Sequence, residues 1–214
     1  MLSIIIPVLN QIEYTKQILR EIKDKTVWDY EILLLISWYD TETESIMKDY
    51  TDIHYCVLDK NEWVNWAWNT GVKKAQWEYV AIINNDLLLC PEWNKLLVEW
   101  LSDCHLTFPA YTTWENPSNN IKYEHISKNN ICWRCYVMRK ADRQEIPEEI
   151  KIRYWDNFIY EYLNKDIKCV KDCVIHHFES KTVLGEEFAD KINARILEDK
   201  KARFKMYQDK CTKE

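Results

Sequence analysis

Short apolar runs alternate with amphipathic stretches through the first half of the chain, and this alternation limits the possible folds more than any other feature. The apolar runs have the length and the β-branched residues of buried strands, and they fall at residues 2–7, 30–37, 53–58 and 79–83. The intervening stretches read as helices at residues 12–22, 40–50 and 61–75. This order predicts βαβ units with right-handed crossovers and a mostly parallel sheet.

The second half of the chain departs from that pattern. We expect helices at residues 91–101 and 154–163, and strands at residues 106–113, 131–139 and 167–175. Residues 115–130 are polar and indicate a loop or a small hairpin. The predicted architecture is therefore α/β, with a mostly parallel central sheet flanked by helices, a small mixed β region and a charged C-terminal helix.

Composition excludes several classes of function. The 214 residues have a net charge of −6, which argues against a broad nucleic-acid-binding surface. Only 2 residues are Gly, so a Gly-rich phosphate-binding loop is excluded. No apolar run is long enough to span a bilayer and no signal peptide is recognisable, so the 8 Cys are expected to be reduced thiols in a cytoplasmic protein.

The strand at residues 79–83 ends in three oxygen-bearing side chains, Asn84, Asn85 and Asp86. In open α/β sheets, ligands bind outside the carboxyl ends of the strands. A Mg²⁺ or Mn²⁺ ion that holds a substrate diphosphate usually takes one or two carboxylates from the protein. The stretch therefore predicts a cation site, with an ordinary loop as the alternative, because Asn and Asp also favour turns.

Six segments in a fixed order resemble family 2 of the glycosyltransferases, which has the GT-A fold. They read SIIIPVLN, YEILLLIS, NEWVNWAWNTGVKKAQWEYVAIINND, PEW, YWDNFIYEYL and VIHHFES. The resemblance covers roughly residues 2–182, and Asn84-Asn85-Asp86 is similar to the Asp-x-Asp motif of the family. It implies that Asp86 binds the Mn²⁺ or Mg²⁺ that holds a nucleotide sugar, most simply a UDP-sugar. The residues that the resemblance assigns to the donor are Pro7, Val8, Asn10, Ser37, Asn61, Asn65, Asn69, Asn84 and Asn85.

Some positions differ from the family pattern. Ile36 and Ser37 stand where the family usually has the Asp that reads the nucleotide base, so selection among bases is expected to be loose. Asp40 lies nearby and could replace that acid, although it is also a candidate helix N-cap. Trp68 stands where the family often has Arg, and Trp63 and Trp77 stand where it often has Gly.

Trp155-Asp156 occupies the place of the acidic motif that supplies the catalytic base in this family. Inverting transfer needs one carboxylate to deprotonate the acceptor hydroxyl, and the resemblance assigns that role to Asp156. Trp155 would then stack on an acceptor sugar. The alternative for Asp156 is a helix N-cap after Tyr154.

His176 and His177 follow the last predicted strand, where neighbouring side chains point to opposite faces. The resemblance implies that one of them completes the metal site. We favour His176, with His177 as the alternative. A zinc site built from Cys132, Cys135, Cys169 and Cys173 is disfavoured, because the gap between the two pairs is longer than zinc ribbons use and i and i+3 face opposite ways in a strand.

The resulting prediction is a metal-dependent inverting glycosyltransferase acting on a glycan, glycoprotein or lipid hydroxyl. Residues 1–182 would form one domain, with the nucleotide sugar held by residues 1–101 and the acceptor and base by residues 102–182. Residues 183–214 would be a charged helix or a connection. One alternative is an inactive module that only binds sugar nucleotide or glycan. Another is a nucleotidyltransferase, which would need a Gly- and Lys-rich N-terminal loop that residues 8–14 lack.

Overall fold

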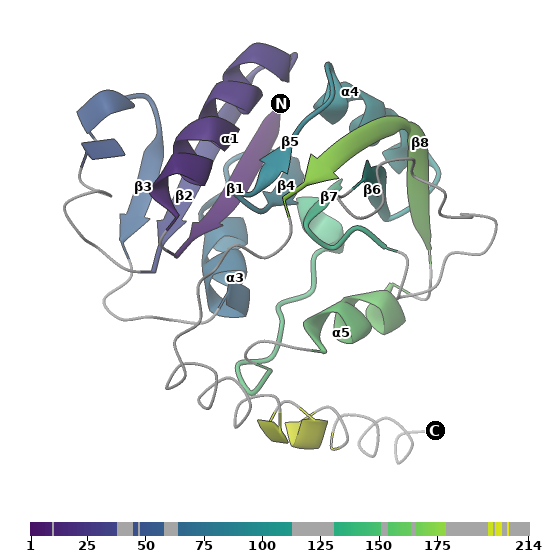
Figure 1. Cartoon of the computed structure of the whole chain (residues 1–214). Helices are drawn as coiled ribbons and strands as arrows, with labels where there is room; N and C mark the ends of the chain where they lie inside the picture. Colours follow the sequence, from purple (N-terminus) through teal and green to yellow (C-terminus); the bar gives the residue numbers. More distant parts are fainter. Residues whose placement is uncertain are drawn as a thin grey trace.

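The computed structural model describes most of the chain up to residue 178 and a few residues near the C-terminus (Figure 1). The described residues are 1–9, 11–37, 45–46, 48–57, 64–112, 131–150, 154–163, 166–178, 197–198, 200–202 and 205. Within these ranges, no helix has both the length and the apolar character needed to cross a bilayer.

An eight-stranded sheet runs through the described residues in the order β3-β2-β1-β4-β7-β6-β8-β5. The strands are β1 (Leu2–Val8), β2 (Tyr30–Ile36), β3 (His54–Val57), β4 (Tyr79–Ile83), β5 (Leu87–Leu88), β6 (Leu106–Thr112), β7 (Cys135–Arg139) and β8 (Ile167–His177). Strands β1 to β4 are mutually parallel, whereas β7 runs antiparallel to β4 and β6, and β5 runs antiparallel to β8. The predicted mostly parallel sheet with a mixed region is confirmed.

Helices pack against this sheet and contribute side chains to the hydrophobic core. They are α1 (Ile12–Lys25), α3 (Val64–Lys74), α4 (Trp93–Val98) and α5 (Trp155–Tyr162), with 3₁₀ turns η1 (Glu99–Ser102) and η2 (Lys140–Asp142). Helix α1 buries Thr15, Ile18, Leu19 and Ile22, the spacing of one helical face. Helix α3 contacts β1 and β2, and α4 contacts β6, β7 and β8.

Several predicted boundaries differ from the observed ones. Strand β1 continues through Pro7 to Val8. Proline is tolerated there because the pairing of β1 with β4 ends at Ile5, so the missing N–H of Pro7 removes no hydrogen bond to β4. Residues 131–134 form a turn before β7 rather than the start of the strand. The helix predicted at residues 91–101 starts at Trp93 and tightens into η1. The stretch at residues 113–130 lies outside the described residues, as do most of residues 38–50 and 179–214.

Gly71 allows α3 to lie close to the sheet. A Cβ atom placed on Gly71 would lie 2.4 Å from Cγ2 of Ile5 and 3.3 Å from a methyl of Leu35. Ile5 is fully buried and branched at Cβ, so its methyl group cannot swing away. Any side chain at position 71 must therefore push α3 away from β1 and β2.

We expect Gly71→Ala to lower the free energy of unfolding by about 1 to 3 kcal/mol, the usual range for overpacking a core. This loss exceeds the gain of about 1 kcal/mol from replacing Gly by Ala inside a helix. Urea unfolding followed by circular dichroism measures it. Lys74→Ala, at an exposed position of the same helix, is the control and should change stability by less than about 0.5 kcal/mol. A Gly71→Ala variant as stable as the wild type would contradict this interpretation.

Candidate active site

The carboxyl ends of β1, β2 and β4 lie side by side at one edge of the sheet. The backbone N–H of Ser37, just after β2, donates to the carbonyl of Val8 at the end of β1 over 2.9 Å. Asn84, Asn85 and Asp86 follow the end of β4, the other neighbour of β1. The strand order changes direction here, since β1 lies between β2 and β4. Ligands in open α/β sheets bind at such a point.

The predicted donor-binding residues do not all meet at this edge. Pro7, Val8, Ser37, Asn84 and Asn85 lie at or next to the strand ends. Asn10 and Asn61 lie outside the described residues. Asn65 and Asn69 lie on α3, and their side chains bind the backbone of Ile150 and Ile146 instead.

Asp86 lies in a buried polar pair. Its Oδ2 atom is 3.1 Å from Nε2 of His177, and only 8% of Asp86 and 2% of His177 is exposed. The Oδ1 atom of Asp86 is buried and has no hydrogen-bond partner among the described residues. A buried carboxylate oxygen that lacks a partner is destabilising unless something else binds it, which makes this oxygen a candidate contact for a cation or a ligand.

The short ladder between β5 and β8 brings this pair together. Leu87 pairs with His177, and the backbone N–H of Phe178 donates to the carbonyl of Asp86 over 3.1 Å. Because alternate residues of β8 face opposite sides, His176 is directed elsewhere: its Nδ1 lies 3.1 Å from Oγ1 of Thr112. The sequence favours His176 over His177, whereas the structure places His177 against Asp86.

The two asparagines before Asp86 are tied to their surroundings. The side chain of Asn85 donates to Oγ1 of Thr15 on α1 over 3.0 Å. The backbone N–H of Asn84 donates to the carbonyl of Arg134, in the turn before β7, over 2.8 Å. These bonds fix the path of the chain between the end of β4 and Asp86.

Asn65 and Asn69 bind backbone groups of the segment that precedes α5. The Asn69 amide donates to the carbonyl of Ile146 over 2.7 Å and accepts from the N–H of Ile146 over 3.1 Å. The Asn65 amide donates to the carbonyl of Ile150 over 2.9 Å. All four residues are buried. The two asparagines, one helical turn apart on α3, therefore hold residues 146–150 in place.

We expect Asn69→Ala to destabilise the fold by about 2 to 4 kcal/mol, because the N–H and the carbonyl of Ile146 would both lose a buried partner. Lys73→Ala is a matched control. Lys73 lies on the same helix as Asn69, and its exposed ion pair is with Glu145, which directly precedes Ile146. Exposed pairs contribute about 0 to 1 kcal/mol, so the control should unfold at nearly the wild-type urea midpoint. Equal midpoints for the two variants would contradict a clamping role for Asn69.

Helix α5 carries the predicted base. The helix begins at Trp155 after Tyr154, which has a left-handed backbone conformation (φ 65°), so Asp156 lies in the first turn and is not the N-cap. The Trp155 ring packs edge-on against Trp68 of α3 at 4.4 Å between centroids and against Trp133 at 5.4 Å. Trp155 thus attaches the start of α5 to the rest of the fold, in addition to any contact with an acceptor.

The cysteines considered for zinc do not form a metal centre in the part of the chain that is described. No three His, Cys, Asp or Glu side chains there are arranged to share an ion. Burial raises the pKa of the Cys132 thiol to about 11 and that of the Cys135 thiol well above its usual value. Cys132 and Cys135 are fully buried core residues.

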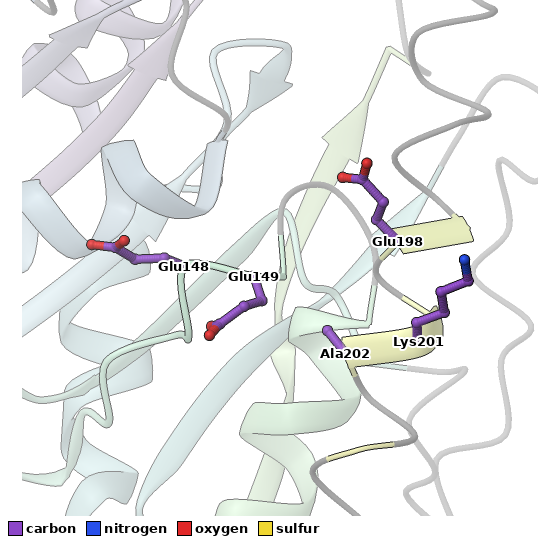
Figure 2. A pocket seen from close by; sticks show the side chains of 5 residues that line it. All are labelled: Glu148, Glu149, Glu198, Lys201 and Ala202. Carbon is purple, nitrogen blue, oxygen red and sulfur yellow. The ribbon is translucent and has the colours of Figure 1, made fainter.

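A pocket of about 490 Å³ lies between the turn at residues 147–150 and the helical residues near the C-terminus (Figure 2). It is lined by Glu148, Glu149, Glu198, Lys201 and Ala202. Three carboxylates against one ammonium group would repel a diphosphate. The strand ends around Asp86 are therefore the better place for a nucleotide sugar.

Comparisons with known proteins agree with this geometry. The family model described as glycosyl transferase family 2 matches residues 3–163. An uncharacterised glycosyltransferase of Rickettsia bellii (strain RML369-C) is 27% identical over 129 residues, which make up 56% of this chain and 18% of that protein.

Solved structures share the fold at low sequence identity. The structure of S. aureus TarS 1–349 in complex with UDP has a TM-score of 0.68 at 15% identity, covering 92% of this chain and 64% of that one. The structure of GalNAc-T7 with UDP, GalNAc and Mn²⁺ has a TM-score of 0.69 at 13% identity, covering 83% of this chain and 44% of that one. The chain thus spans less than two thirds of the length of each of these relatives. The family match over most of the chain, on a sheet of this topology, shows that the chain belongs to glycosyl transferase family 2 and has the GT-A fold.

Proposed function

We propose that this protein transfers a hexose, with inversion, from a UDP-sugar to a hydroxyl group of a glycan, glycoprotein or lipid acceptor. The observation that carries the proposal is the Asp86–His177 pair, buried where the parallel strands end, with one carboxylate oxygen lacking a partner among the described residues. Membership of the family supports the proposal, as do the similar structures solved with UDP or with UDP and Mn²⁺.

Asp86 and His177 fit a divalent cation, Mn²⁺ or Mg²⁺. Two neighbouring ligands of an octahedral ion with bonds of about 2.1 Å lie about 3 Å apart, and the facing atoms of Asp86 and His177 are 3.1 Å apart. Two protein ligands are enough, since such ions usually complete their shell with water and substrate phosphates. When bound, the cation would neutralise the negative charge on the departing diphosphate.

The residues at the strand ends would hold the rest of the donor. Val8 and Ser37 lie at the ends of β1 and β2, and Asn84 and Asn85 lie between the end of β4 and Asp86. We withdraw Asn65 and Asn69 from the donor-binding set, because their amide groups bind the backbone of residues 146–150. In this proposal they act at a distance, by fixing the segment that leads to α5.

Asp156 would supply the base. As the acceptor oxygen attacks the anomeric carbon, the carbon–oxygen bond to the diphosphate breaks on the opposite side, and the acceptor proton passes to the Asp156 carboxylate. Trp155, next to it and half-buried, would bound the acceptor site. Residues 1–101 would thus hold the nucleotide and residues 102–182 the acceptor, except that His177, from the second part, would be a metal ligand.

The test is release of UDP from a panel of UDP-sugars in the presence of Mn²⁺, with EDTA as the control. If the protein is a metal-dependent glycosyltransferase, we expect it to hydrolyse its donor slowly when water replaces the acceptor. UDP should then be released with Mn²⁺ and should not be released with EDTA. A binding module would show a rise in melting temperature with a UDP-sugar but no UDP release. The proposal would be refuted if no nucleotide sugar caused either UDP release or a rise in melting temperature.

A further inference from the structure

Two cysteines lie in contact at the far end of the ladder that carries Asp86 and His177. The Sγ atoms of Cys90 and Cys173 are 3.4 Å apart. Cys90 follows β5, four residues after Asp86, and Cys173 lies in β8, four residues before His177. Because β5 and β8 are antiparallel, the thiol pair and the Asp86–His177 pair close opposite ends of one short ladder.

Cys90 has the surroundings of a reactive thiol. It is half-buried, and the ammonium group of Lys25 lies close by, donating to the carbonyl of the adjacent Leu89 over 2.7 Å. The hydrogen bond with Cys173 is the main cause that lowers the pKa of Cys90; burial opposes it and Lys25 adds to it. The same hydrogen bond, with burial, raises the pKa of Cys173, which favours Cys173 as the thiol that keeps its proton.

Other thiols of the described chain differ in this respect. Burial raises the pKa of Cys104 to about 11 and that of Cys169 to about 12, which holds both as unreactive thiols at neutral pH. Cys90 thus combines partial exposure, a lowered pKa and a second sulfur in contact. A reactive cysteine beside a second thiol that can resolve it is typical of redox-sensitive sites.

We propose that Cys90 and Cys173 form a peroxide-sensitive pair that is oxidised to an intramolecular disulfide. This disulfide would link the chain after β5 covalently to β8. The inference is independent of the proposed sugar transfer. It is consistent with a reducing compartment, where disulfides are transient and act as sensors.

The chemistry balances with hydrogen peroxide as the oxidant. The Cys90 thiolate attacks one peroxide oxygen, the O–O bond breaks, and the departing hydroxide takes up a proton to become water, which leaves a sulfenic acid on Cys90. The sulfur of Cys173 then attacks the Cys90 sulfur, the S–O bond breaks, and hydroxide leaves with the Cys173 proton as a second water. Two electrons pass from the sulfurs to the peroxide.

The experiment treats the full chain, in a Cys211→Ser background because residue 211 lies outside the described residues, with about one equivalent of hydrogen peroxide. We expect a mass loss of about 2 Da, a Cys90–Cys173 peptide in the digest, and a rise in melting temperature of about 5 to 10 °C that dithiothreitol reverses, because the bond would close a long loop. Cys173→Ser should instead accumulate a dimedone-reactive sulfenic acid on Cys90. Cys56→Ser, which changes the other half-buried cysteine of the described chain, should behave like the parent.

Three results would overturn the proposal. One is a disulfide that joins other cysteines or two chains. The second is dimedone labelling of Cys56 ahead of Cys90 in the Cys173→Ser variant. The third is an unchanged mass after oxidation, which would show that the pair does not close to a disulfide in the folded protein.

Discussion

Asp86→Asn is expected to weaken Mn²⁺-dependent UDP binding by more than about 100-fold. Loss of a residue that merely orients a metal ligand typically reduces affinity 10- to 100-fold, so loss of a charged ligand should exceed that range. Asn keeps the shape of the side chain and one oxygen, which suits a residue that is only 8% exposed. Titration calorimetry with UDP, with Mn²⁺ and with EDTA, measures the effect.

A matched control is Asp142→Asn, because Asp142 also faces a histidine: its Oδ2 is 3.2 Å from Nδ1 of His105, well away from the strand ends. That variant should bind UDP like the wild type. His177→Gln should weaken metal-dependent binding more than His176→Gln does. Unaltered UDP affinity in Asp86→Asn would remove Asp86 from the metal site, and a larger effect of His176→Gln would restore the original choice of histidine.

Asp156→Asn is expected to lower kcat by about 10² to 10⁴-fold, the usual contribution of a general base. The loss should appear equally in kcat/KM, with donor affinity unchanged, as for an interaction made only in the transition state. Helix α5 starts one residue before Asp156, so the substitution breaks no N-cap. Its effect on stability should be confined to the helix dipole, about 0.3 to 1 kcal/mol.

Glu161→Gln, on the same helix, is the control and should change kcat less than about twofold. If Asp156→Asn retains more than about a tenth of the wild-type rate while Glu161→Gln abolishes transfer, the base is Glu161. The comparison separates a chemical role from damage to α5, because both variants replace one carboxylate of that helix by an amide.

The sheet was predictable from the sequence where short apolar runs alternate with helical spacing, as in β1, β2 and β4. The position of Asp86 followed directly, because it depends only on where β4 ends. The choice between His176 and His177 was harder, since β8 contains an irregularity in its register with β6 between Pro109 and Ala110. Cys173, Val174 and Ile175 are three consecutive apolar residues, so the sequence does not alternate between apolar and polar residues there. The alternation therefore did not show which face of β8 carries His177.

The roles of Asn65 and Asn69 could not be predicted for a different reason. Their partners are backbone atoms of Ile150 and Ile146, 85 and 77 residues away along the chain. Every residue has these groups, so no pattern of side chains reveals which of them needs a partner. Trp133 was missed as a neighbour of Trp155 because the predicted strand at residues 131–139 begins with a turn.

Three helices begin directly after a residue that has a left-handed backbone conformation but is not glycine. Gln11, Glu92 and Tyr154, just before α1, α4 and α5, have positive φ angles of 60°, 56° and 65°, and none of them caps its helix with a side-chain hydrogen bond. A left-handed backbone costs about 1 to 2 kcal/mol for a residue that is not glycine. The fold therefore stores conformational strain beside the strand ends and beside the predicted base, and surrounding contacts such as those of Trp155 must hold that strain in place.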